Sequence, residues 1–281
     1  MKKIHRVSWI RVFLFIFVLF VGHLSSYAYD WSSSSYSGFW NNEPNVADSA
    51  PKEIGTNKYE ISTPKQLAFL SYVAEKGSKI LRQRYLTAQY VLTADLDMSG
   101  HFWAPIGKDA DDYRWQGTLD GQGHAISNLY IYKDSKCSAL FSAVDMSCTI
   151  SNLRMVNCFV EGDDYSALLI GLVKKASGKV TINNVHVRGG HVSSHGELSA
   201  GGLIGEVQNH SKVEITDCYV DCRMHSDNVG RGAGEFIGKI YTNSSVTISN
   251  SIADIMGNSL YDNKHKFKGG FVGNVTNEAC V

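Results

Sequence analysis

The sequence predicts an all-β fold, a right-handed parallel β-helix (a solenoid) with repeats of about 33 residues and one N-terminal capping α-helix. Three observations indicate this fold. A short glycine-ended block occurs four times, and a second block recurs in step with it. No segment from residue 137 onward shows a sustained 3.6-residue apolar stripe, which excludes helical repeats. Repeats with a period in this range are typical of solenoids.

The first block is apolar or β-branched and ends in glycine in all four copies. The copies span residues 167–171, 201–205, 234–238 and 269–273, and their closing glycines lie 34, 33 and 35 residues apart. Such glycines either adopt positive φ or allow another segment to approach closely. We expect the residues at one shared position to stack in a single buried column: Leu169, Leu203, Phe236 and Phe271.

The second block has strand character and contains a turn residue. Its copies span 150–153, 182–185, 215–218 and 248–251, at intervals of 32, 33 and 33 residues. Its third position holds Asn152, Asn184, Asp217 or Asn250. Because Asn and Asp side chains bond to nearby backbone groups, this position is predicted to turn a corner. In the copy at 212–224, Val213, Ile215, Cys218 and Val220 are expected to point inward.

The glycine-ended block resembles the GLUG motif, in which Gly and Leu precede a hydrophobic residue and a second Gly. Residues 202–205 fit this pattern, 270–273 fit with Phe in place of Leu, and the other two copies lack the first Gly. The matching positions are Leu168, Leu169, Ile170, Gly171, Gly202, Leu203, Ile204, Gly205, Phe236, Ile237, Gly238, Gly270, Phe271, Val272 and Gly273.

The resemblance covers about residues 58–281, including the lead-in segments 103–107 and 117–126. It implies a bacterial surface or secreted β-helix of the kind found in Bacteroidetes. Some proteins of this kind form the stalks of larger adhesins, and the motif also accompanies immunoglobulin-A-cleaving metallopeptidases.

The first 28 residues have the pattern of a secretory signal peptide. Four basic residues accompany an apolar run at 12–21, and Ser26-Tyr27-Ala28 predicts cleavage after Ala28. The run is too short for a membrane-spanning helix, which needs about 20 apolar residues. The mature chain is therefore expected to be secreted or at the cell surface, without a membrane span.

Three segments follow the predicted signal peptide. Residues 29–57 are expected to form a partly disordered lead whose aromatic residues pack on the first repeat or, alternatively, form a sugar-binding platform: Trp31, Tyr36, Phe39 and Trp40. Residues 58–136 are expected to contain the helical cap and the first coils of the solenoid, and residues 137–281 the GLUG-type repeats.

The helical cap is predicted at residues 64–76. Thr63 and Gln66 form a capping-box pattern around Pro64, and Gly77 ends the helix. Its apolar face comprises Leu67, Leu70, Val73 and Ala74. A solenoid exposes an apolar end that needs a cover, so this helix is expected to provide one; the alternative is a partner-binding helix.

Several acidic residues are candidates for chemistry. Asp95 and Asp97 face one way on a strand and suit acid–base or metal chemistry. Asp109, Asp111 and Asp112 form a denser cluster with calcium-binding potential. Asp120 and His124 lie in a segment that resembles one in β-helix polysaccharide lyases and hydrolases. In each case a turn or a solvated surface is the favoured interpretation, so no catalytic, cofactor or metal site is assigned.

Composition excludes further classes of function. The chain has 27 basic and 27 acidic residues, and removing the signal peptide leaves 23 against 27, so a nucleic-acid partner is not expected. The six cysteines form no C-x-x-C pair, and pairing among Cys137, Cys148 and Cys158 stays open. No H-E-x-x-H, G-x-S-x-G or P-loop motif occurs.

These observations favour an exported, non-catalytic, adhesin-like protein that presents loops to an extracellular protein or glycan and needs no cofactor. The alternatives are a β-helix polysaccharide lyase or glycosidase, and a stalk fragment of a larger surface protein or peptidase. The last repeat, at 268–275, is expected to leave an open end that promotes self-association.

Overall fold

The computed structural model describes eight stretches of the chain. They are residues 36–132, 137–145, 147–174, 178–196, 199–208, 210–226, 232–254 and 268–276. All of them belong to the second of two compact units, Ser33–Val281. The predicted signal peptide, its cleavage site at Ala28, Trp31 and Cys280 lie outside the described residues.

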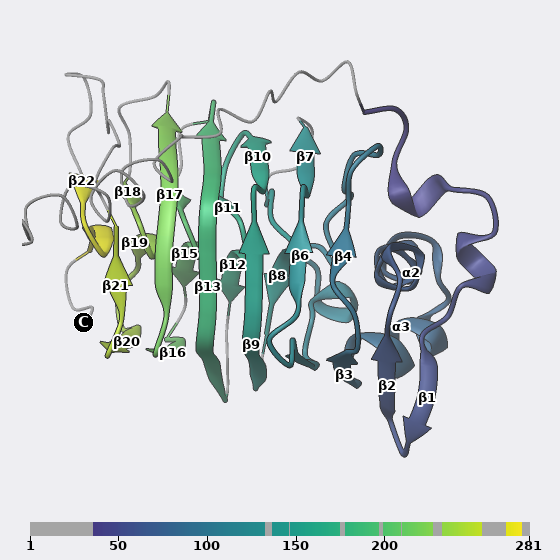
Figure 1. Ribbon diagram of the computed structural model, residues 1–281. Helices are drawn as coiled ribbons and strands as arrows, with labels where there is room; N and C mark the ends of the chain where they lie inside the picture. Colours follow the sequence, from purple (N-terminus) through teal and green to yellow (C-terminus); the bar gives the residue numbers. More distant parts are fainter. Residues whose placement is uncertain are drawn as a thin grey trace, which may run out of the picture. The chain divides into compact units, whose positions relative to one another are not determined.

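The described chain is mostly β and its sheets are parallel, apart from the antiparallel pair β1–β2 (Figure 1). The strands are β1 (Lys52–Gly55), β2 (Lys58–Ile61), β3 (Gln89–Leu92), β4 (Leu96–Asp97), β5 (Thr118–Asp120), β6 (Ala125–Ser127), β7 (Tyr130–Tyr132), β8 (Phe141–Val144), β9 (Cys148–Val156), β10 (Phe159–Gly162), β11 (Ser166–Ala167), β12 (Ile170–Lys174), β13 (Lys179–Ser194), β14 (Ala200–Gly201), β15 (Ile204–Gln208), β16 (Lys212–Thr216), β17 (Tyr219–Ser226), β18 (Ala233–Gly234), β19 (Ile237–Ile240), β20 (Ser245–Ser249), β21 (Ile252–Ala253), β22 (Lys268–Gly269) and β23 (Val272–Val275).

The strands pair at the spacing of the sequence repeat. In the largest sheet the in-register residues are Ile150, Ile182, Ile215 and Ile248. In the sheet β23-β19-β15-β12-β8 they are Ile170, Ile204, Ile237 and Val272. A third sheet, β11-β14-β18-β22, joins the short strands that precede each glycine-ended block. Successive repeats therefore lie side by side through parallel hydrogen bonding.

The predicted corner residues adopt left-handed backbone conformations. Their φ values are 52° at Asn152, 53° at Asn184, 56° at Asp217 and 47° at Asn250. The Asn184 Nδ2 donates to Asn152 Oδ1 at 2.9 Å, and Asn250 donates to Asp217. Asn and Asp tolerate this conformation better than other side chains do. These contacts form a corner ladder, a row of amide and carboxylate groups that links successive repeats.

The closing glycines of the repeated block serve close approach rather than positive φ. Gly171, Gly205, Gly238 and Gly273 are absent from the positive-φ residues. A Cβ atom on Gly205 would lie 2.6 Å from the Gly171 carbonyl oxygen, and one on Gly238 would lie 2.7 Å from the Ala200 oxygen. The chain that precedes each block thus packs directly on the backbone of the neighbouring repeat.

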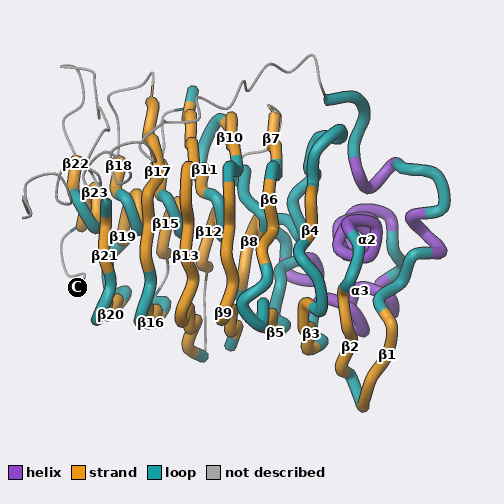
Figure 2. The backbone as a smooth tube through the Cα atoms, in the orientation of Figure 1, coloured by secondary structure: helices purple, strands orange, loops and turns teal. Residues whose placement is uncertain are grey.

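The predicted cap helix is present as α2 (Pro64–Lys76). Thr63 and Gln66 form the capping box, and the predicted apolar face, Leu67, Leu70, Val73 and Ala74, is at most 3% exposed. This face belongs to the same apolar cluster as the interior of the repeats. Figure 2 shows the helices in the part of the described chain before β5.

A second helix, α3 (Lys79–Leu86), follows and was not predicted. Ser78 caps it by accepting a hydrogen bond from the Leu81 N–H. Three short 3-10 helices are also present: η2 (Trp40–Asn42), η3 (Val46–Asp48) and η4 (Asp111–Tyr113).

The prediction of a partly disordered lead is wrong for residues 36–57, which form η2, η3 and β1. Tyr36 and Trp40 are 6% and 9% exposed, and Trp40 Nε1 donates to the Met98 carbonyl at 2.9 Å. These two rings therefore pack on the first repeats, which was the first of the two expectations. They are too buried to form the sugar-binding platform that was the alternative.

The repeat interior is apolar. Val213, Ile215, Cys218 and Val220 are at most 3% exposed, as predicted. The five described cysteines are buried free thiols, so none of the disulfides left open above forms among them. Burial raises the pKa of Cys148 and Cys158 to about 12, which keeps both thiols protonated and unreactive at neutral pH.

Candidate functional site

The paired carboxylates singled out in the sequence are engaged in local and inter-repeat contacts. Asp95 accepts from the Ala125 N–H at 2.9 Å and lies 3.1 Å from His124 Nδ1; these hydrogen bonds lower its pKa. Asp97 accepts from Asn128, and Asp120 from Asn152, at 2.8 and 3.0 Å. Each of the three carboxylates thus bonds its own partner in the adjacent repeat, like the corner ladder.

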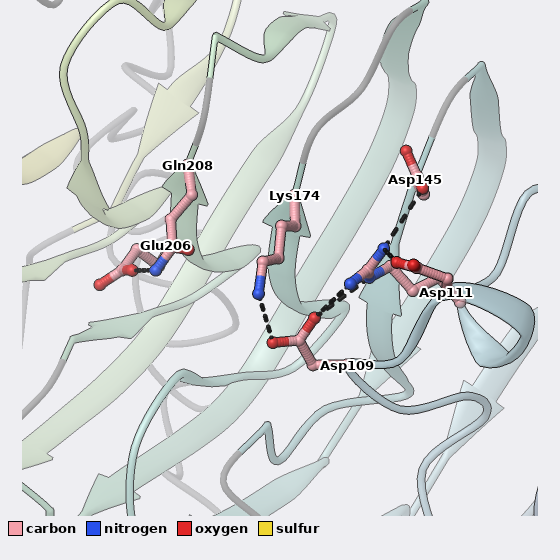
Figure 3. Close-up of polar contacts among 7 residues, drawn as sticks. Asp109, Asp111, Asp145, Lys174, Glu206 and Gln208 are labelled. Carbon is pink, nitrogen blue, oxygen red and sulfur yellow. Dashed lines mark hydrogen bonds and ion pairs between the residues drawn. The ribbon is translucent and has the colours of Figure 1, made fainter.

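The second acidic cluster surrounds a buried cation. Arg114 is 6% exposed, and its guanidinium lies 2.8 Å from Asp109, 2.8 Å from Asp111 and 3.4 Å from Asp145 (Figure 3). Lys174 contacts the other oxygen of Asp109 at 2.7 Å. Asp112 instead pairs with Lys79 at 2.9 Å. We call the contacts of Arg114 and Lys174 with these carboxylates the Arg114 network.

The electrostatics of the Arg114 network are those of an ion-pair cluster. Burial alone would raise the pKa of Asp109, but hydrogen bonds from Lys174 and Arg114 outweigh it and hold the pKa below its ordinary value. A general acid needs the opposite shift. Each of these carboxylates already pairs with an arginine or a lysine, which would compete with a calcium ion. Within the described residues, no group of three or more His, Cys, Asp or Glu is arranged to hold a metal.

Glu206 and Gln208 lie on β15, which pairs with β12, the strand that ends at Lys174, in the sheet β23-β19-β15-β12-β8 (Figure 3). Glu206 is fully buried and accepts hydrogen bonds from Ser199, at 3.2 Å, and from Gln208. Arg114 directly precedes Trp115, which bridges to Val144 of the same sheet. The Arg114 network therefore fixes the loop around η4 to this sheet. The ion pairs of Arg114 and Lys174 with the carboxylates thus have a structural role.

Glu235 was not singled out in the sequence. It occupies the position of the first motif glycine, it is 1% exposed, and no side chain among the described residues donates a hydrogen bond to its carboxylate. Burial, helped by the nearby Asp221 charge, raises its pKa to about 8. A raised pKa suits a general acid, but the side chain is enclosed where a substrate cannot reach it.

Glu235 should make the protein less stable as the pH rises. Its pKa is about 8 when folded and 4.5 ordinarily, so between these values the folded state retains a proton that the unfolded state has lost. The free energy of unfolding then falls with rising pH, by up to about 1.4 kcal/mol per pH unit. We expect Glu235→Gln to remove this slope in urea titrations between pH 5 and 8. The exposed Glu53→Gln should retain it, and parallel curves for wild type and Glu235→Gln would contradict the assignment.

An aromatic row lies on the outer side of the sheet that contains β7, β10 and β13. It comprises Phe102, Tyr130, Phe159 and His191. The ring centroids are 5.3 Å apart for Phe102–Tyr130, 4.9 Å for Tyr130–Phe159 and 4.7 Å for Phe159–His191. Tyr130, Phe159 and His191 are in register across the three strands. Sequence inspection missed the row, although aligning the repeats at 32 residues places Phe159 on His191.

A cleft of about 350 Å³ opens beside the head of this row, bordered by η2, α2 and the segment 103–108. Its lining includes Phe39, Asn41, Glu75, Lys108 and Tyr132. Tyr132 contacts Phe102 of the aromatic row, with ring centroids 5.6 Å apart. Tyr130 is only 3% exposed and contacts the Tyr36 ring edge-to-face, so Phe102, Phe159 and His191 are the half-buried members of the row; with the cleft they define the candidate site.

Comparison with known proteins gives limited matches. No protein-family model matches the sequence. Over 172 residues the chain is 31% identical to Halomucin from Haloquadratum walsbyi; the match covers 56% of this chain but only 2% of Halomucin. In structure, the chain resembles a Bacteroides ovatus protein described as a "putative immunoglobulin A1 protease", with 14% identity and a TM-score of 0.36 over 81% of this chain and 87% of the other.

None of the described helices combines the length and the apolar composition that a bilayer crossing requires.

Proposed function

We propose that this chain is an exported, non-catalytic, adhesin-like surface protein built as a right-handed parallel β-helix of GLUG type. The match to Halomucin supports an extracellular setting. The in-register pairing of successive repeats supports the β-helix. The predicted signal peptide would direct export, and the mature chain would act at the cell surface or as a secreted protein.

The aromatic row is the observation that carries the proposed binding role. Phe159 and His191 are only half-buried, although the residues that flank them, Cys158, Val160 and Val192, are fully buried. Outward-facing aromatic rings in a line offer apolar contact area with little loss of side-chain entropy on binding. We propose that this row contacts an extracellular glycan or protein.

A glycan and matrix-protein array probed with the mature chain, residues 29–281, tests this proposal. We expect at least one reproducible ligand, and about tenfold weaker binding by Phe159→Ala, since losing one stacked ring costs about 1 kcal/mol or more. Tyr219→Ala is the matched control, because Tyr219 is a half-buried aromatic outside the row, in register with His186 rather than with His191. Binding that is insensitive to Phe159→Ala would exclude the row as the contact surface.

The enzyme alternative is tested on the same preparation. Polyuronides, host glycans and immunoglobulin A should remain intact after incubation with the mature chain. Product release that is abolished by substitution of Asp95, Asp97 or Asp120 would instead indicate a lyase, glycosidase or peptidase.

The proposal includes self-association through the last described repeat. Ile252, Phe271 and Val275 are 61%, 42% and 41% exposed, and β23 pairs with β19 alone among the described strands. Unpaired strand edges recruit other chains, and a lysine on an edge strand opposes this. We expect light scattering to detect dimers of the mature chain and Val275→Lys to shift them toward monomer. A monomer at all concentrations would contradict this part of the proposal.

A further inference from the structure

The cleft beside the aromatic row has a fixed aromatic wall. Trp103 is 1% exposed and its Nε1 donates to the Leu140 carbonyl at 3.3 Å, so this indole is held in place. Phe102 packs between Phe39 and Tyr132, at centroid distances of 5.9 and 5.6 Å. Tyr132 lines the cleft and remains 39% exposed. The wall therefore combines a rigid base with one accessible ring.

The lining of the cleft also contains polar groups that are held by their neighbours. Asn41 is 2% exposed and donates from Nδ2 to Glu75 Oε2 at 2.6 Å, which orients the carboxylate of an otherwise exposed α2 residue. Lys76 likewise donates to Asn42 Oδ1. Lys108 Nζ rests 4.1 Å from the centroid of the Tyr113 ring. Carboxylate and amide acceptors and an ammonium donor thus border one small cavity.

The charged residues in the lining of the cleft indicate which class of ligand it could bind. The lining contains one carboxylate, Glu75, and one ammonium, Lys108. A site for phosphate or a uronic acid would require an excess of positive charge, and a site for a cation would require an excess of negative charge. A wholly apolar ligand would leave the polar groups of the lining unpaired, which is unfavourable. A neutral molecule with an apolar face and several hydroxyl groups satisfies both the aromatic and the polar residues of the lining.

We propose that this cleft binds a neutral saccharide residue, a hexose or an N-acetylhexosamine. The apolar face of the pyranose stacks on Tyr132, and neighbouring hydroxyl groups bond to Glu75 and Lys108. A volume of about 350 Å³ suits one or two sugar rings, since it lies near the lower end of ligand pockets. The assignment rests on the proposed function, because the cleft adjoins the aromatic row through the contact between Tyr132 and Phe102. A glycan lying along the row would end in the cleft.

Saturation-transfer NMR and calorimetry with methyl glycosides test this assignment on the mature chain. The probes are glucose, galactose, mannose, N-acetylglucosamine and N-acetylgalactosamine, with glucuronic acid and inorganic phosphate as charged comparisons. We expect at least one neutral glycoside to bind, and Glu75→Ala and Tyr132→Ala each to weaken it about tenfold, as loss of one hydrogen bond to a charged group or one stacked ring implies.

Two matched variants control for indirect effects. Glu53→Ala removes an exposed carboxylate and Tyr219→Ala an aromatic ring, both outside the cleft lining, and both should bind as wild type does. Unchanged melting temperatures show that the variants are folded. Absence of binding by all five neutral probes, tighter binding of glucuronic acid or phosphate, or full binding by Glu75→Ala would overturn the assignment.

The two proposals fail in distinguishable ways. If an array ligand is lost with Phe159→Ala but retained with Glu75→Ala, the row binds and the cleft inference is wrong. If a neutral glycoside binds in a Glu75-dependent way while Phe159→Ala has no effect on any ligand, the cleft inference stands and the role of the row is wrong.

Discussion

Leu203→Asp should lower the free energy of unfolding by about 4 kcal/mol or more, because it places an unpaired charge in an apolar interior. Leu203 is fully buried, as are Leu169 and Phe236 at the same position of neighbouring repeats. The Leu203 N–H donates to the Phe236 carbonyl at 3.1 Å, so the side chain cannot leave the interior without breaking the pairing of two repeats. Urea denaturation followed by circular dichroism measures the loss.

Phe271→Asp provides the matched control for this substitution. Phe271 occupies the same position one repeat beyond Phe236, and their ring centroids are 5.1 Å apart. It is nevertheless 42% exposed, so a charge there stays hydrated and should cost far less. Equal losses for the two variants would show that burial of the shared position is not the cause.

Gly205→Ala should be the second most damaging change, with a loss of about 2–3 kcal/mol from overpacking. The added Cβ would lie 2.6 Å from the Gly171 carbonyl oxygen and 2.8 Å from the Tyr165 carbonyl carbon. Both contacts are to backbone, so neither neighbour can yield by rotating a side chain. Thermal melting at constant protein concentration measures the effect.

Gly270→Ala is the control within the same motif. A Cβ atom at Gly270 would meet nothing within 4 Å, and this glycine does not have positive φ. Alanine should therefore be neutral or slightly stabilising there, since it restricts the unfolded chain. A Gly205→Ala protein that melts like Gly270→Ala would contradict the close-approach role of the closing glycine.

The features that could be predicted from the sequence are those that depend on a few neighbouring residues, especially where the same short pattern recurs in several repeats. The corner position could be predicted because Asn and Asp favour left-handed turns, and four copies in step strengthened the signal. The cap helix could be predicted from Thr63, Pro64 and Gln66. The helix α3 also has a cap residue, Ser78, but it lacks an apolar face, because it buries only Tyr85 and Leu86 and leaves Ile80 79% exposed.

The candidate site was harder to predict because it depends on contacts across repeats. Arg114 meets Asp145, 31 residues away, and Asp109 meets Lys174, 65 residues away. The aromatic row mixes Tyr, Phe and His at equivalent positions, so no single residue type recurs to mark it. Likewise, the cleft requires η2 to pack on α2, whereas the composition of that part of the lead predicts partial disorder.

The corner ladder also bears on how such a chain changes length during evolution. Its links between neighbouring repeats use similar chemistry, as in Asn184 to Asn152 and Asn250 to Asp217, while Asp217 accepts from Asn183 of the preceding repeat. If one whole repeat is duplicated or deleted, the repeats that become neighbours can therefore form the same kind of amide or carboxylate contact. An insertion of one residue within a strand would instead turn its buried side chains outward. Growth by whole units is thus tolerated, and the gene can lengthen the protein without redesigning its interior.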